Sequence, residues 1–486
     1  DRFGALTVAL AAPLDGPSRA EAIGAIAALP DPAACETLTD PGELALPQDP
    51  PGRARVVEAE HTLDRAWAEY ELGHYAAAGE TLKELASSRD LGAPALHAAT
   101  LLLGAAIESR IGIPTTARSL LESALLAAAA AKAPEIEAQV WARLLRHELF
   151  AGAPSKVIEW SPFALAAAAR AGHEGAEIDG IVGEAMRDAG NLAGARVHLA
   201  RALASKDPLR GEQRALLEMN AGAVELAAGL PGAAEPALQR ALVLARGALG
   251  EDHPTLAIYL DKLAAADRTR GRLRDALARH DQSLALRTAA FGKADRSVAT
   301  SLLGRARTLL EANRLDEATR DAATALEIRT AAYGAASPRL GEVIALQGDL
   351  AIAANDLIAA RDLYGRAATI DPRLDLVARR AVAGAIVTLD DLPTSVDPLT
   401  IDRAAALAVR VPLLPPEQGR TLAFALRTRI AGAGPFDPAL ALPIAEALLL
   451  IGDRTGAVDI ATRTLGQLGD EPSRSRDRAR RLIAPP

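Results

Sequence analysis

Turn residues recur along this chain at an almost constant interval. Gly250, Gly292 and Gly334 stand 42 residues apart, and a second series of Gly or Asn residues, ending with Gly271 and Asn355, keeps the same spacing. Each turn is followed by an amphipathic stretch that is too long for a strand, so one period contains two helices. Such a helix pair does not bury its apolar face alone and must stack on its neighbours. We therefore expect an all-α fold, a right-handed α-solenoid of helix hairpins.

The second series of turns continues toward the N-terminus with intervals of 38 to 42 residues. Gly and Asn suit the end of a helix, where the backbone often becomes left-handed. Nearly every residue five positions after these turns, and most of those seven positions before them, are small, which lets neighbouring helices approach closely. The turn residues are Gly73, Gly112, Gly152, Gly190, Gly229, Gly271, Asn313 and Asn355.

These patterns divide the chain into three parts. Residues 1–52 are predicted to hold short helices and a proline-rich linker, with helical periodicity beginning near Arg53. Residues 53–373 are predicted to form eight repeats of 38–42 residues. Residues 374–486 lose the phase and are expected to form degenerate repeats and a C-terminal cap with a polar outer face.

The composition supports a helical chain and limits its partners. Hydrophobic residues make up 50% of the sequence but aromatic residues only 3%, so Ala and Leu supply most of the apolar surface. The net charge of −8 argues against general nucleic-acid binding. The arginine-rich segment 474–481 is interpreted as a solvated helix, with a nucleic-acid or anionic-lipid contact as the alternative. No apolar stretch reaches the ~18 residues of a membrane span.

The sequence contains no pattern that indicates catalysis, a cofactor or a metal. The single cysteine, Cys35, excludes an internal disulfide, and no two of the eight histidines are spaced i, i+4 to share a metal. Phosphate-binding loops, zinc-protease helices and nucleophile elbows are absent. We expect no catalytic, cofactor-binding or metal-binding residues in this chain.

Binding is the remaining class of function. Polar residues on the first helix of each pair would line the concave side of such a stack and meet a peptide or protein. Each of them has an alternative interpretation as part of a solvated face. The candidates are Asp64, Arg65, Arg143, Arg146, Asn220, Asp261, Lys262 and Arg305.

The repeated columns resemble the tetratricopeptide repeat. The segments Gly73 to Ala78 and Gly190 to Ala195 carry its turn and small residues, and Gly250 to Pro254 with the 42-residue interval is similar to the kinesin-light-chain variety. The resemblance covers residues 53–373 and implies a groove that binds a peptide or protein. That variety usually places paired asparagines in the first helix. Here Asn220 matches in part, and the later repeats have Asp261-Lys262, Leu303-Gly304 and Ala345-Leu346.

Residues 1–130 also resemble the region that follows the membrane span in large bacterial serine/threonine kinases with C-terminal tetratricopeptide repeats. The cues are Asp1-Arg2, the segment Ala33 to Cys35 and the proline-rich linker before Arg53. The resemblance implies a sensing or docking region on the extracytoplasmic side of the inner membrane, and a disulfide partner for Cys35 upstream of Asp1. A small buried thiol is the alternative for Cys35. No kinase motif occurs in this chain.

A second interpretation places the repeats in a cytoplasmic signal-transducing ATPase or transcriptional regulator. The chain begins with Asp1 rather than Met, which indicates a piece of a longer polypeptide. A kinase domain and an apolar span upstream of Asp1 would favour the first interpretation, and a nucleotide-binding domain the second.

Overall fold

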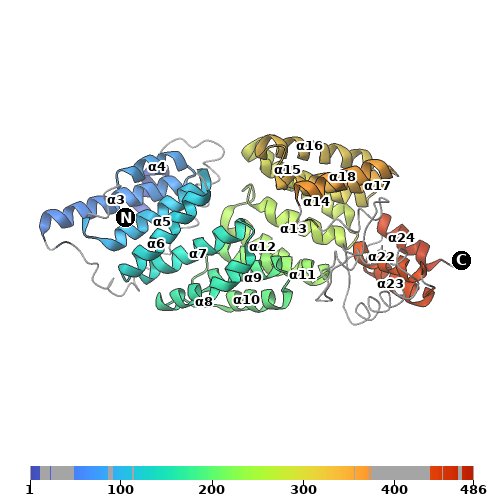
Figure 1. Cartoon of the computed structure of the whole chain (residues 1–486), viewed down its shortest axis with the longest axis horizontal. Coiled ribbons are helices and arrows are strands. Elements are labelled where there is room, and N and C mark those ends of the chain that lie inside the picture. The colour runs from blue at the N-terminus through green and yellow to red at the C-terminus, as the bar shows by residue number, and fades with distance from the viewer. Residues whose placement is uncertain are drawn as a thin grey trace. The chain divides into compact units, whose positions relative to one another are not determined.

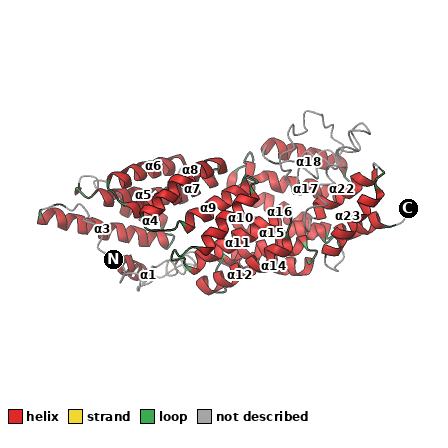
Figure 2. Ribbon diagram, turned by 90° about the horizontal axis from the view of Figure 1, so that it is seen from below, coloured by secondary structure: helices red, strands yellow, loops and turns green. Residues whose placement is uncertain are grey.

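The computed structural model describes residues 2–10, 22, 47, 49–85, 91–111, 114–354, 356–371, 374, 438–450, 452–468 and 473–484. Within these residues all regular structure is helical, and no strand is present (Figure 2). Consecutive helices pack against each other as hairpins, and each hairpin packs against the next. The prediction of an all-α fold built from stacked helix hairpins is confirmed.

The helices gather into two compact units. The first unit comprises Asp1–Ala221 and Val243–His253, and the second comprises Gly222–Leu242 and Pro254–Pro486. Helices α11 (Gly211–Ala227) and α12 (Pro231–Leu249) contribute residues to both units.

The first unit holds four hairpins that follow one another in chain order (Figure 1). Within each hairpin the two helices make close contact, and the first helices of neighbouring hairpins, α3, α5, α7 and α9, also contact one another in sequence. The helices of this unit are α1 (Arg2–Leu10), α3 (Pro50–Glu71), α4 (Tyr75–Lys83), α5 (Pro94–Ile111), α6 (Pro114–Ala130), α7 (Pro134–Phe150), α8 (Pro154–Arg170), α9 (Ala176–Asp188) and α10 (Leu192–Ala204).

The second unit repeats this arrangement. Its first helices α13, α15 and α17 contact one another in sequence, and three further helices near the C-terminus share a separate apolar cluster. The helices are α13 (Leu256–Thr269), α14 (Leu273–Phe291), α15 (Arg296–Glu311), α16 (Leu315–Tyr333), the 3₁₀ helix η3 (Pro338–Leu340), α17 (Gly341–Ala353), α18 (Leu357–Ile370), α22 (Pro438–Leu450), α23 (Arg454–Gln467) and α24 (Arg474–Ile483).

The predicted turns are left-handed wherever the structure describes them. Gly73, Gly152, Gly190, Gly229, Gly271 and Asn313 all have positive φ, between 59° and 80°. Gly112 and Asn355 lie outside the described residues. Lys132, just after α6, adopts φ 52°, although a side chain disfavours this conformation.

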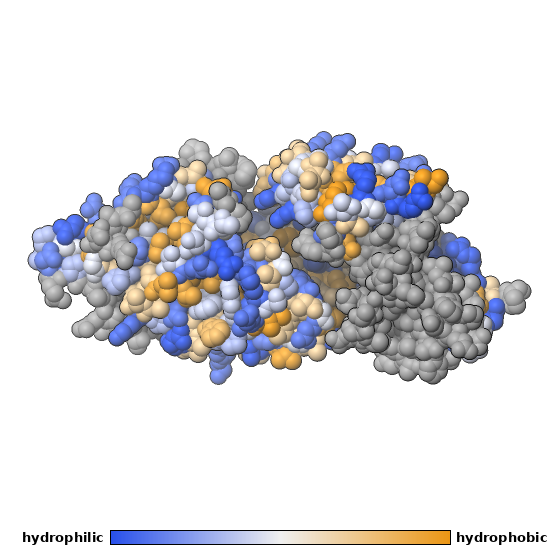
Figure 3. All heavy atoms as spheres, viewed as in Figure 1, coloured by the Kyte–Doolittle hydropathy of each residue, from blue (hydrophilic) through white to orange (hydrophobic). Residues whose placement is uncertain are grey.

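The column of small residues five positions after each turn is fully buried. Its members have 0% relative exposure: Ala78, Ala117, Val157, Ala195, Ala234, Ala276, Ala318 and Ala360. Small residues at this phase let the second helix of each hairpin lie close to its neighbours, so the phase of the column follows from the packing. Figure 3 shows polar and apolar residues interspersed on the visible surface of these hairpins.

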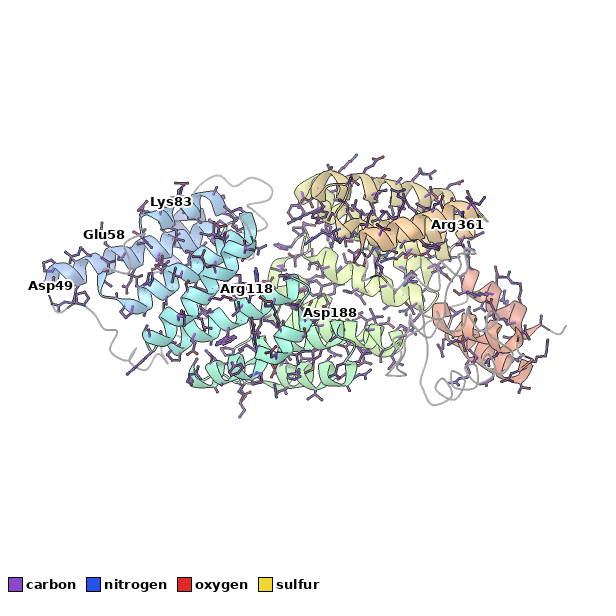
Figure 4. All side chains as sticks on the ribbon, viewed as in Figure 1. Asp49, Glu58, Lys83, Arg118, Asp188 and Arg361 are labelled. Carbon is purple, nitrogen blue, oxygen red and sulfur yellow. The ribbon has the colours of Figure 1, made fainter. Side chains whose placement is uncertain are left out.

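The first long helix begins earlier than the sequence predicted. Helix α3 starts at Pro50 and not near Arg53, so the end of the proline-rich segment is helical. Pro50 and Pro51 occupy the first helical positions, where a missing N–H costs nothing. Asp49, labelled in Figure 4, accepts a hydrogen bond of 2.7 Å from the Gly52 nitrogen and caps the helix.

A carboxylate from a later loop caps helix α9. The Asp207 side chain accepts hydrogen bonds of 2.8 to 2.9 Å from the backbone nitrogens of Glu174, Gly175 and Ala176. Burial alone would raise the pKa of Asp207, but these three donors and nearby His173 lower it below its ordinary value. The loop before α9 is thereby fixed to the loop after α10.

Candidate functional site

The eight side chains predicted to line a binding surface are spread over five helices and both units. Asn220 is buried, and its amide nitrogen lies 3.5 Å from Glu184 Oε2. The structure places Asp64 and Arg65 on α3, Arg143 and Arg146 on α7, Asn220 on α11, Asp261 and Lys262 on α13, and Arg305 on α15. Their role in binding stays a prediction, and their surroundings differ widely.

Two of the predicted residues in the first unit make only peripheral ion pairs. Arg65 forms an exposed pair of 2.8 Å with Glu84 of α4. Arg146 approaches Glu177 of α9 no closer than 3.7 Å, which is beyond a hydrogen bond. Asp64 is partly buried one turn before the aromatic residues of α3.

The third predicted residue of this unit, Arg143, lies on aromatic rings. Trp67 and Tyr70 are three residues apart on α3 and so share one face of that helix. Their rings meet edge to face with centroids 5.6 Å apart. The Arg143 guanidinium carbon lies 5.4 Å from the Trp67 ring centre and 6.0 Å from that of Tyr70. Arg143 comes from α7, so this contact joins the first helices of the first and third hairpins. We call these three residues the aromatic–arginine site.

The aromatic surface continues beyond these three residues. Tyr75, at the start of α4, lies 5.4 Å from the Tyr70 ring, centre to centre. Arg110, at the end of α5, stands 5.7 Å from the Tyr75 ring centre. Four helices, α3, α4, α5 and α7, therefore contribute rings or cations to one continuous set of contacts.

The charges near Trp160 of α8 contrast with this site. Arg118, labelled in Figure 4, and Lys156 both lie about 6 Å from the Trp160 ring centre, at 5.8 and 6.0 Å. Both also pair with the buried carboxylate of Glu148, at 2.8 and 3.2 Å. A hydrogen bond to Glu122 raises the pKa of Arg118 further. These cations are neutralised within the protein.

Asp261 belongs to a buried polar network in the second unit. His280 Nδ1 lies 3.1 Å from Asp261 Oδ1, and Arg287 donates to Asp261 Oδ2 at 2.7 Å. Ser301 also donates to Asp261 and lies 2.6 Å from the Ser283 hydroxyl. Burial opposes ionisation, but the hydrogen bond with His280 and the charge of Arg287 lower the pKa of Asp261. The network joins α13, α14 and α15, and leaves the Asp261 side chain 17% exposed.

Arg305 is held by two carboxylates. Its guanidinium donates two hydrogen bonds to Asp321, of 2.7 and 2.9 Å, and one of 2.7 Å to Asp281. The hydrogen bonds to Asp321 raise the pKa of Arg305 although burial opposes them. Bidentate pairing of this kind fixes the side chain and satisfies its donors. Lys262 is partly buried on α13.

Metal and membrane sites were sought over the same residues. In the part of the chain that the structure describes, no three His, Cys, Asp or Glu side chains are grouped to hold a metal ion. None of the described helices is long and apolar enough to cross a membrane. Cys35 lies outside the described residues.

Sequence analysis named Arg143 but missed the aromatic residues around it. Arg143 is more than 70 residues away from Trp67 and Tyr70, so only the stacking of hairpins reveals their proximity. One signal was available. The chain has three tryptophans, and all of them, Trp67, Trp141 and Trp160, fall in its first third.

Comparison with known proteins identifies the repeats. The family model of the tetratricopeptide repeat matches residues 213–289, and a second model with the same description matches residues 298–339. The chain contains tetratricopeptide repeats. No curated protein sequence matches.

Several solved structures are similar to the repeat region. A putative kinesin light chain from Podosopora anserina with TPR-like repeats is 18% identical, covering 40% of this chain and 94% of its own, with a TM-score of 0.34. BtubC from P. vanneervenii is 17% identical over 52% and 97%, with a TM-score of 0.36. The apo quorum sensor NprR from B. thuringiensis is 12% identical over 65% and 99%, with a TM-score of 0.40. Nothing about the ligand of this chain follows from these values.

Proposed function

We propose that this chain is a non-catalytic scaffold that binds a peptide or protein partner through the tetratricopeptide-type hairpins of its first unit. The aromatic–arginine site carries the proposal. It places Trp67, Tyr70 and Arg143, from two first helices, on one surface. Trp, Tyr and Arg are the residue types that supply most binding energy at protein interfaces. The chain is otherwise poor in aromatic residues, which makes their concentration here informative.

We further propose that the scaffold is the sensing or docking region of a bacterial serine/threonine kinase on the extracytoplasmic side of the membrane. The resemblance of residues 1–130 to such kinases supports this proposal. The coding sequence upstream of Asp1 tests it. A kinase domain followed by an apolar span is expected. A nucleotide-binding domain in that position would instead favour the cytoplasmic ATPase or transcriptional regulator.

Peptide selection tests the binding function directly. A phage library of random dodecapeptides would be selected on the immobilised chain, and enriched peptides would be synthesised and titrated. Binding should change the emission of Trp67 in a W141F/W160F variant, in which Trp67 is the only tryptophan. The absence of any peptide enriched above the uncoated surface would contradict the proposed function.

A further inference from the structure

The guanidinium of Arg143 has an unusual environment in this chain. Its interactions with the described residues are the contacts with the Trp67 and Tyr70 rings, and none of these residues accepts a hydrogen bond from it or pairs with its charge. By contrast, Arg118 pairs with Glu148, and Arg305 is clamped by carboxylates. Arg143 is therefore a partly buried cation whose five N–H donors have no acceptor within the described protein.

A second polar group beside Arg143 is also unused. The Tyr70 side chain makes ring contacts, but its hydroxyl has no hydrogen-bond partner among the residues that the structure describes. The hydroxyl both donates and accepts, whereas the guanidinium only donates. These two groups lie over an aromatic floor in which Trp67 is only 9% exposed. A few convergent polar groups on an apolar surface are typical of a ligand site.

The surrounding charge favours an anionic ligand. Arg146 follows Arg143 by three residues on α7 and has only the 3.7 Å approach of Glu177, and Arg110 lies over Tyr75. The acidic side chain nearest in sequence to Trp67 and Tyr70 on α3, Glu69, accepts a hydrogen bond of 2.7 Å from the Thr81 hydroxyl. A guanidinium stacked on rings keeps its in-plane donors available, and these match the two oxygens of a carboxylate.

We infer that the aromatic–arginine site binds an extended acidic peptide, with an Asp or Glu side chain on Arg143 and the Tyr70 hydroxyl and a neighbouring apolar side chain on the rings. This inference rests on the proposed function and names the class of partner. A single stacked guanidinium fits one carboxylate, whereas phosphorylated motifs are usually read by clusters of arginines. The occupant is thus a carboxylate-bearing segment of a partner protein.

The dodecapeptide library separates this inference from the binding function itself. It would be selected in parallel on the wild-type chain, on R143Q, R143K and Y70F, and on R65Q as a matched control. Arg65 is an exposed arginine of the same unit that pairs with Glu84. Circular dichroism of each variant confirms that the helical fold is retained.

Peptides selected on the wild-type chain should be enriched in Asp or Glu at a fixed distance from an aromatic or aliphatic residue. Their affinity should fall at least about tenfold on R143Q, because a charge-assisted hydrogen-bond pair is lost. R143K should recover only part of the affinity, since lysine lacks the planar fork, and Y70F should cost several-fold. R65Q should bind like the wild type.

Other outcomes overturn the inference in distinguishable ways. Enriched peptides without acidic residues, or acidic peptides that bind R143Q and the wild type equally, would show that the scaffold binds peptides but not as inferred. Phosphorylated versions that bind more than tenfold better than their carboxylate counterparts would replace the carboxylate by a phosphate. Failure to enrich any peptide would instead remove the proposed function.

Discussion

At the scale of single residues, the hairpins are held by matched sizes across each helix pair. Gly183 on α9 faces Leu199 on α10, and a methyl group added at Gly183 would lie 2.7 Å from the Leu199 Cγ. The same positions in a later hairpin pair Gly348 with the ring of Tyr364. A small residue in one helix therefore makes room for a large one in its partner. Such close-packed sites tolerate little added volume.

This matching predicts opposite effects for two Gly→Ala changes in helices. Gly183→Ala should lower the free energy of unfolding by about 1–3 kcal/mol, because the new methyl group overlaps Leu199. Gly247→Ala, in α12, should raise it by about 0.5–1 kcal/mol, since its methyl group meets nothing within 4 Å and alanine favours the helix. Urea denaturation followed by circular dichroism measures both. Equal effects would contradict the size matching.

The Asp207 cap predicts a pH-dependent stability. Its pKa is lowered in the folded protein, so its contribution is present above the ordinary value of 3.8 and is lost as the pH falls through the folded value. Asp207→Asn should cost about 1–2 kcal/mol at pH 7 and should leave a smaller loss of stability on acidification.

Thermal unfolding of the wild type and D207N between pH 3 and 7 measures this contribution. Asp188, labelled at the end of α9 in Figure 4, is more exposed and pairs with the adjacent Arg187, so Asp188→Asn is the matched control. D188N should unfold like the wild type at pH 7. A D207N variant with unchanged stability at pH 7 would show that the cap contributes nothing.

At the scale of helices, sequence reasoning succeeded where the signal is local. A left-handed turn needs Gly or Asn at one position, so the turns at Gly190 and Asn313 were predictable from spacing alone. The network around Asp261 was not. Arg287 and Ser301 lie 26 and 40 residues away along the chain, and only the packing of three helices brings them to Asp261. The aromatic–arginine site was partly predictable for the same reason.

The same network predicts strong coupling between Asp261 and Arg287. Asp261→Ala should destabilise the chain by about 3 kcal/mol, because it leaves the buried Arg287 charge without its carboxylate. Replacing both, as in D261L/R287M, should cost less than D261A, since apolar side chains can fill the space of a buried pair. The equivalent of Asp261 one repeat later is Leu303, which is buried.

A double-mutant cycle with D261L, R287M and the double variant, measured by urea denaturation, gives the coupling free energy. Additive effects would show that the two side chains act independently and that the network has no cooperative role.

At the scale of the whole molecule, the two units differ in how they can be observed. All three tryptophans, Trp67, Trp141 and Trp160, belong to the first unit, whereas helices occur throughout both. Tryptophan emission therefore reports the first unit, and far-ultraviolet circular dichroism reports both. In a stack of hairpins stability is approximately a sum of local terms, so a change in one unit need not spread to the other.

This separation predicts different responses of the two probes. Asp261→Ala lies in the second unit and should lower the urea midpoint by circular dichroism while shifting the emission midpoint much less. Gly183→Ala lies in the first unit and should lower the emission midpoint. Coincident shifts of both probes in both variants would mean that the chain unfolds as a single cooperative block.

The exposed, left-handed Lys132 between α6 and α7 has a consequence for the ligand site. A backbone cut by a lysine-specific protease at this turn would leave Trp67 and Tyr70 on one fragment and Arg143 on the other. Recovery of peptide affinity would then depend on the concentration of the two pieces. The turn thus offers a natural place to divide the protein into complementing halves whose reunion can be read out by ligand capture.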